Sequence, residues 1–170
     1  DSGVLLYNGE IFNYAELSQK YGLKAGRSDT AVLAELIDKN LLDFAELDGF
    51  FAIVYLDADG NLRHCARDRF GVKPLYFFRD GDRISICSEP KVLQVLHGLQ
   101  VSKTAIEDYL NLRAPVSVPS FFEGVDQVRK GTCLVTGLYF DLHKFLEQIK
   151  GALGSNKQLE ATIKKKIESR

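Results

Sequence analysis

Two consecutive β-hairpins in the middle of the chain constrain its fold more than any other feature of the sequence. Residues 50–57 are rich in β-favouring side chains and lead into the turn sequence Asp57–Asn61, which returns the chain through residues 62–66. A second pair of β-rich runs, 75–78 and 84–87, flanks another turn that contains Asp-Gly. Because tight turns join antiparallel strands, the sequence predicts an antiparallel meander here.

Helical patterns lie on both sides of this meander. Before it, Asn13 is the predicted N-cap of a helix over 14–21 that ends at Gly22, and Ser28 begins a second helix that runs to about Lys39. After it, the apolar spacing predicts helices over 89–96, from Ser102 onward and over 142–153, with one strand over 132–138.

The composition is that of an ordinary core-forming domain. The 170 residues are 45% hydrophobic and 26% charged, which excludes disordered and collagen-like classes. The formal net charge is only −1, so we expect no nucleic-acid partner and no membrane partner. The longest apolar run, residues 50–56, is far shorter than the ~20 residues that a membrane-spanning helix needs.

The cysteines and histidines suggest neither a metal site nor a disulfide framework. Cys65, Cys87 and Cys133 are widely separated, and no Cys-x-x-Cys pair occurs. The three histidines have no partner at the i, i+4 spacing of a helical metal site. We therefore expect no metal and a reducing, cytoplasmic location.

The sharpest candidate site is Asn8-Gly9-Glu10, at the end of a strand predicted over residues 4–7. The side-chain amide of Asn8 and the backbone N–H of Gly9 offer two donors that could form an oxyanion hole. A simple turn is the alternative interpretation, because Asn-Gly is a frequent hairpin dipeptide. From the residues alone, the turn is favoured.

Asp29 is a second candidate, in the first turn of its predicted helix. Its carboxylate suits an α-ammonium group, and Glu10 could supply a second negative charge. The alternative is that Asp29 only stabilises the helix dipole. The charged run 67–74 is equally open to two interpretations, a surface for another domain or a locally neutralised loop. No phosphate-binding loop occurs, so nucleotide binding has no support.

Taken together, several segments resemble the glutaminase domain of glutamine-hydrolysing asparagine synthetases. They match in order and spacing, and they are 7–14, 28–30, 47–52, 67–76, 88–91 and 119–125. The resemblance implies an α+β fold, an α/β/β/α sandwich of two antiparallel sheets of the N-terminal-nucleophile hydrolase type. It also implies hydrolysis of glutamine to glutamate and ammonia for ATP-dependent amidation of aspartate.

The same resemblance assigns roles to four residues. Asn8 and Gly9 become the oxyanion hole, while Glu10 and Asp29 hold the α-amino group of glutamine. No cofactor is implied for this domain, since ATP and Mg²⁺ belong to the synthetase domain, which is the implied partner in cis or in trans. Residues 1–153 correspond to the glutaminase domain, and 154–170 to a linker and the first synthetase helix.

The family nucleophile is a cysteine at the mature N-terminus, whose own α-amine can act as base. This sequence starts with Asp1, and an internal cysteine has no free α-amine beside it. We therefore expect the chain to lack the nucleophile and strands of both sheets, to be inactive alone, and to self-associate through unpaired edges. Two alternatives stay open: a non-catalytic docking or regulatory module, or the glutaminase-like domain of another ATP-dependent amide-forming enzyme, such as a β-lactam synthetase or a peptide cyclase.

Overall fold

The computed structural model describes residues 3–152, with side chains through residue 149. The chain separates into two compact units, Asp1–Tyr139 and Phe140–Arg170. Both the domain boundary expected at 153/154 and the synthetase helix expected after it lie outside the described residues. No helix within the described part is long and apolar enough to cross a membrane.

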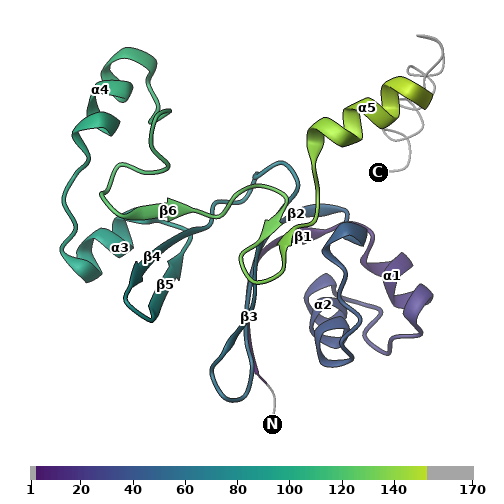
Figure 1. Cartoon of the computed structure of the whole chain (residues 1–170). Coiled ribbons are helices and arrows are strands. Elements are labelled where there is room, and N and C mark those ends of the chain that lie inside the picture. Colours follow the sequence, from purple (N-terminus) through teal and green to yellow (C-terminus); the bar gives the residue numbers. More distant parts are fainter. Residues whose placement is uncertain (1–2, 153–170) are drawn as a thin grey trace. The chain divides into compact units, whose positions relative to one another are not determined.

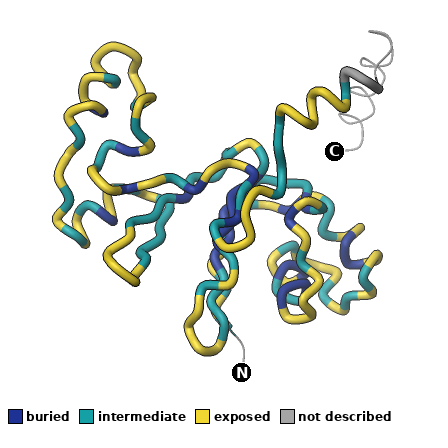
Figure 2. The backbone as a smooth tube through the Cα atoms, in the orientation of Figure 1, coloured by how far each residue is buried: buried dark blue, intermediate teal, exposed yellow. Residues whose placement is uncertain are grey.

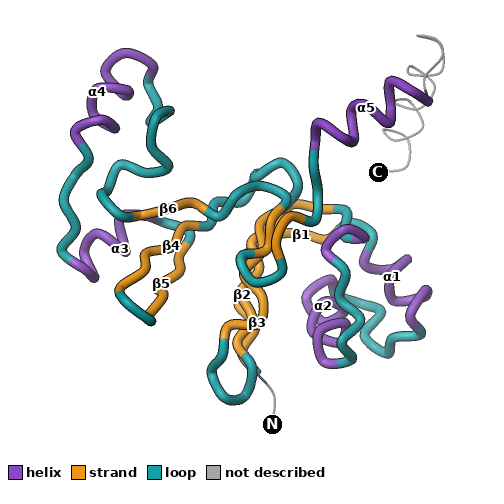
Figure 3. Tube along the Cα trace, in the orientation of Figure 1, coloured by secondary structure: helices purple, strands orange, loops and turns teal. Residues whose placement is uncertain are grey.

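The larger sheet of the first unit has five antiparallel strands in the order β1-β2-β3-β7-β8. They are β1 (Val4–Ile11), β2 (Gly49–Leu56), β3 (Leu62–Arg67), β7 (Thr132–Cys133) and β8 (Gly137–Leu138). The predicted hairpin is therefore β2–β3, and β1 is the terminal strand on one side of this sheet, as described. In Figure 3, β1, β2 and β3 are the orange segments at the centre of the view.

The smaller sheet has three antiparallel strands in the order β5-β4-β6. They are β4 (Tyr76–Asp80), β5 (Arg83–Cys87) and β6 (Val125–Gln127). The second predicted hairpin is thus β4–β5, and β6 joins it from a distant part of the sequence. Two antiparallel sheets with helices confirm the α+β class.

Helices α1 (Tyr14–Tyr21) and α2 (Asp29–Asp38) belong to the core of the larger sheet, and α2 contacts β1 (Figure 1). Their apolar faces are buried against β1, β2 and β3 together with the 3₁₀ turn Phe44–Glu46. The largest fully buried side chains of this core include Leu33, Leu36 and Phe51. Burial of such a face, rather than helix propensity, supplies most of a helix's stability.

A second core joins the two sheets. Ala52, Val54 and Cys65 of the larger sheet pack in one cluster with Leu75 and with Phe77 and Ile86 of the smaller sheet. On the other face of β4, the ring of Phe78 lies 4.6 Å from that of His97. His97 ends α3 (Pro90–His97), so the layers run from helices through two sheets to a helix again.

Two further helices complete the described chain. Helix α4 (Lys103–Leu112) begins at Ser102, whose hydroxyl accepts a hydrogen bond from the Ala105 N–H and so confirms the predicted cap. Helix α5 (Leu142–Ala152) belongs to the second unit, and its first turn is capped by Asp141, which accepts hydrogen bonds from the N–H groups of His143 and Lys144.

Local predictions failed where long-range pairing decides. The single strand predicted over 132–138 is a short hairpin, β7–β8, and β6 was not predicted because its three residues have no periodicity of their own. The predicted side-chain cap at Asn13 is also wrong, although the helix bounds and the left-handed Gly22 cap are confirmed. The Asn13 side chain instead makes tertiary hydrogen bonds.

Candidate functional site

The Asn8-Gly9 dipeptide lies inside strand β1 and forms no turn. The strand continues to Ile11, with Asn8 opposite Ala52 and Gly9 opposite Phe51 in the neighbouring β2. The interpretation of this dipeptide as a turn is therefore wrong, because pairing over eight residues outweighs the local turn preference of Asn-Gly. The side chains alternate along β1, and this places Asn8 and Glu10 on the exposed face.

A pocket of about 400 Å³ lies beside Asn8. Its wall combines residues of both sheets: Leu5, Leu6, Tyr7, Asn8, Ala52, Val54, Leu75, Ile86, Cys87 and Ser88. The lining is mainly apolar with a few polar groups, which is typical of a small-molecule site. Asn8 is the one predicted site residue in this wall, and Gly9, Glu10 and Asp29 lie along the same strand or beside it.

Gly9 occupies a position that only glycine can fill without a shift of backbone. Its φ is +154°, and a Cβ there would stand 2.0 Å from the carbonyl oxygen of Phe50. The Phe12 N–H donates to the backbone carbonyl of Asp48 on the β2 side, whereas the Ile11 N–H donates to the carboxylate of Asp29. Because successive N–H groups in a strand alternate in direction, we infer that the Gly9 N–H points to the same side as that of Ile11, away from β2.

Asp29 reaches β1 from the first turn of α2. Its Oδ2 accepts hydrogen bonds from the Tyr7 hydroxyl at 2.7 Å and from the Ile11 N–H at 3.2 Å. Burial opposes ionisation of this carboxyl, but the hydrogen bonds from Tyr7, Ile11 and Thr30 outweigh it and lower its pKa. Asp29 is therefore an ionised carboxylate fixed at the edge of β1.

Glu10 adds a second carboxylate to the same end of β1. It is exposed and shares a strand face with Asn8. The pKa of Tyr7 is raised by burial first, then by the hydrogen bond and charge of Asp29, and least by the charge of Glu10. The structure thus links Asp29 to Tyr7 by a hydrogen bond, places Glu10 on the exposed face of β1 and leaves Asn8 on the pocket wall.

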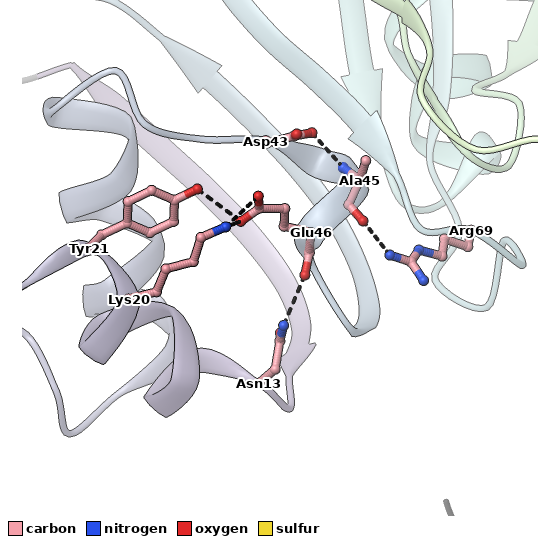
Figure 4. Close-up of polar contacts among 7 residues, drawn as sticks. All are labelled: Asn13, Lys20, Tyr21, Asp43, Ala45, Glu46 and Arg69. Carbon is pink, nitrogen blue, oxygen red and sulfur yellow. Dashed lines mark hydrogen bonds and ion pairs between the residues drawn. The ribbon is translucent and has the colours of Figure 1, made fainter. Parts of the chain in front are cut away.

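The end of β1 is fastened by the 3₁₀ turn that precedes β2 (Figure 4). The Asn13 amide donates to the Glu46 carbonyl at 2.9 Å, and its oxygen accepts from the Asp48 N–H at 3.0 Å. The Glu46 carboxylate accepts from Lys20 at 2.6 Å and from the Tyr21 hydroxyl at 2.9 Å. These contacts fix the chain directly after the predicted site residues.

The charged run 67–74 is a structural loop between the two sheets. Asp68 is fully buried, and its carboxylate accepts hydrogen bonds from the N–H groups of Phe70, Val72 and Lys73. The Arg67 guanidinium donates to three backbone carbonyls, one of them that of Val128. Arg67 and Asp68 therefore fit the interpretation of a locally neutralised loop. The side chains of Phe70 and Val72 in the same loop are exposed.

The three thiols are free, and Cys87 alone of them is not fully buried. Cys65 and Cys133 are fully buried, and burial raises the pKa of Cys65 to about 12. Burial also opposes ionisation of Cys133, but hydrogen bonds with His64 and Thr136 lower its pKa to about 6. Cys87 lines the pocket, and burial raises the pKa of its thiol. Among the described residues, no cluster of His, Cys, Asp or Glu could hold a metal ion.

The α+β fold has two antiparallel sheets with a pocket between them, and Asn8 lies in the wall of that pocket. This arrangement is consistent with a sandwich of the N-terminal-nucleophile hydrolase type. A family model described as a glutamine amidotransferase domain matches residues 1–141. The chain therefore belongs to the glutamine amidotransferase domain family.

The similar proteins with names are asparagine synthetases. The chain is 33% identical over 147 residues to a provisionally named glutamine-hydrolyzing asparagine synthetase 2 of Methanocaldococcus jannaschii, covering 83% of this chain and 28% of that protein. It is 30% identical to asparagine synthetase 1 of Bacillus subtilis strain 168 (64% and 18% covered). It is 32% identical to the Homo sapiens asparagine synthetase (62% and 20% covered). The chain thus spans less than a third of these relatives.

Sequence reasoning missed Tyr7 and the far wall of the pocket. Tyr7 was assigned to a buried strand on its apolar neighbours, and its hydroxyl meets Asp29 only through a contact between residues 22 positions apart. Cys87 and Ser88 come from β5 and the residue after it, which face Asn8 only once the two sheets pack. In the sequence, only the resemblance of residues 88–91 to the glutaminase domain of asparagine synthetases indicated that this wall of the pocket could be functional.

Proposed function

We propose that this chain is the glutamine-hydrolysing part of an asparagine-synthetase-like enzyme. Glutamine would be converted to glutamate and ammonia, and the ammonia would serve ATP-dependent amidation of aspartate by a synthetase domain in cis or in trans. The observation that carries this proposal is the edge of β1, where Asn8 borders a pocket and an ionised Asp29 is held beside the same strand.

The proposed pose places the two ends of glutamine along β1. The side-chain amide lies in the pocket, with its carbonyl oxygen accepting from the Asn8 amide and the Gly9 N–H. These donors stabilise the oxyanion that forms when the carbonyl carbon is attacked, and loss of one such donor typically costs about 10²–10³ in rate. The α-ammonium group lies at the other end, between Asp29 and Glu10.

The chemistry requires a nucleophile, which the resemblance assigns to a cysteine at the mature N-terminus. The terminal α-amine takes the proton of the thiol, and the thiolate forms a bond to the amide carbon. The resulting ammonium group returns that proton to the amide nitrogen, the C–N bond breaks and ammonia leaves a thioester. Water then cleaves the thioester and releases glutamate. We propose that a segment of the protein outside these 170 residues supplies that cysteine, since Cys65 and Cys133 are buried and Cys87 has no α-amine of its own.

Cellular context is part of the same proposal. Three free thiols suit a reducing compartment, so we propose a cytoplasmic enzyme whose ligase activity resides in the synthetase domain. ATP and Mg²⁺ are assigned to that domain and not to this one.

Two measurements test the proposal. Isothermal calorimetry should detect glutamine binding to this chain and its loss in Asp29→Asn, with Asp126→Asn on an exposed part of β6 as the matched control. Glutaminase assays on a version extended upstream to a terminal cysteine should detect ammonia, and replacement of that cysteine by alanine should abolish it. Absence of both binding and hydrolysis would contradict the proposal and favour the non-catalytic docking module.

A further inference from the structure

We propose that Tyr7 is a positioning residue for glutamine, because its hydroxyl holds the Asp29 carboxylate in the orientation that receives the α-ammonium group. This inference rests on the proposed function and goes further, since it divides the two oxygens of Asp29 into one that fixes the side chain and one that meets the ligand.

The first oxygen of Asp29 is fully committed to the protein. Oδ2 accepts the Tyr7 hydroxyl at 2.7 Å and the Ile11 N–H at 3.2 Å, and both donors belong to β1. A carboxylate oxygen has about two lone-pair sites, so these two donors fill Oδ2. Oδ2 therefore ties the first turn of α2 to the strand that carries Asn8 and Gly9.

The second oxygen has an exchangeable partner. Oδ1 accepts the Thr30 N–H at 2.7 Å, a contact between adjacent residues, and the Thr30 hydroxyl at the longer distance of 3.3 Å. Thr30 is exposed and its hydroxyl can rotate, so an incoming ammonium group can replace it at Oδ1. A charged donor on a carboxylate makes a stronger hydrogen bond than a neutral hydroxyl.

Tyr7 is suited to this task because its ring and its hydroxyl have separate surroundings. The ring packs against the core formed by β1, α1 and α2, which fixes where the hydroxyl lies. Burial, the hydrogen bond to Asp29 and the negative charges of Asp29 and Glu10 raise the pKa of the hydroxyl, so it stays protonated and remains a donor. Phenylalanine would keep the packing and remove only the donor.

The test compares glutamine with an analogue that lacks the α-amino group. Calorimetry would use this chain with glutamine and with 5-amino-5-oxopentanoate, which keeps the amide and the carboxylate. Tyr7→Phe should weaken glutamine about tenfold, in line with loss of a hydrogen bond to a charged group. The same variant should leave the affinity for the analogue unchanged, and Thr30→Ala should not weaken glutamine.

Two controls separate positioning from a general loss of structure. Tyr14→Phe makes the same chemical change at another tyrosine that packs against this core, and it should leave glutamine affinity unchanged. In Tyr7→Phe, the ¹³C resonance of the Asp29 carboxyl should titrate at a higher pH, since a hydrogen bond that lowers its pKa is gone.

The outcomes distinguish this inference from the proposed function. If glutamine binds, Asp29→Asn abolishes binding, and Tyr7→Phe either has no effect or weakens both ligands equally, the positioning role of Tyr7 is overturned and the proposed function stands. If Asp29→Asn binds glutamine normally, the assignment of Asp29 to the α-ammonium group is overturned and this inference with it. If the unmodified chain fails to bind glutamine and the version extended to a terminal cysteine fails to hydrolyse it, the proposed function is overturned as well.

Discussion

Helices α1 and α2 of the first unit are buried more completely than helices α3 and α4. Figure 2 shows more buried backbone in α1 and α2 than in α3 and α4. Leu33 of α2 is 0% exposed, whereas Leu93 and Ala105 are the buried residues of α3 and α4. On α4, Leu110 is 68% exposed. Helices α1 and α2 thus form a closed core with the larger sheet, whereas α4 and α3, which contacts β4 and β5, leave apolar side chains in solvent.

This difference explains where the candidate site can be precise. Asp29 and Tyr7 belong to the closed layer, so packing fixes both partners of the hydrogen bond that orients the carboxylate. The far wall of the pocket, at Cys87 and Ser88, belongs to the less buried sheet. We therefore expect substitutions in the first layer to change stability and ligand binding far more than those in the second.

The largest expected effect is a truncation inside the closed layer. Leu33→Ala should lower the free energy of unfolding by about 3 kcal/mol, because it removes a fully buried side chain and leaves a cavity. Leu110→Ala, a matched change on α4, should change it by less than about 0.5 kcal/mol. Urea denaturation measures both, and equal losses would contradict the comparison.

The loop between the two sheets should show the next largest effect. Asp68→Asn replaces a fully buried carboxylate that accepts three backbone N–H groups, so one amide nitrogen must face donors. We expect a loss of about 2 kcal/mol in the free energy of unfolding. Asp126→Asn on the exposed face of β6 is the control. If Asp68→Asn lowers the free energy of unfolding no more than this control does, the loop does not depend on Asp68.

The ion pair on the 3₁₀ turn should matter less. Lys20 is about half exposed, and it also lies over the Tyr21 ring at 4.8 Å. Lys20→Ala should lower the free energy of unfolding only slightly, because exposed ion pairs contribute little. Raising the salt concentration should reduce the difference in free energy of unfolding between the variant and the parent. If that difference persists in high salt, it comes from packing and not from the ion pair.

The smallest effect concerns pH at the end of α2. The pKa of Glu35 is lowered to about 2 by Lys39 and by the N–H groups of Ala25 and Lys24. A lowered pKa in the folded state means that this stabilisation is present above pH 4.5 and is lost as the pH falls toward 2. Stability measured from pH 5 to pH 2 should fall less steeply in Glu35→Gln, and identical slopes would refute this role.

Sequence reasoning succeeded where local chemistry decides the structure. Gly22 ends α1 in a left-handed conformation and Ser102 caps α4, so these helix ends were readable from single residues. The turn predicted at Asn8-Gly9 was wrong because pairing with β2 decides the conformation there. Pairing within a sheet overrides the local turn preference of the residues involved.

The site was predictable only in part, for a related reason. The resemblance nominated Asn8, Gly9, Glu10 and Asp29, but it could not reveal which groups surround them. The link between Tyr7 and Asp29 joins a strand to a helix end 22 residues away, and the pocket joins two sheets. Such contacts arise from packing, so no pattern of spacing within either segment predicts them.

The most direct test of a glutamine site at the edge of β1 is a nuclear magnetic resonance titration of the chain with glutamine, which follows each backbone N–H. We predict that the Gly9 and Ile11 resonances move most, and that Asp29→Asn prevents the movement. If glutamine shifts only residues of α3 and α4, or if Gly9 does not respond at saturating concentration, the site described here is wrong.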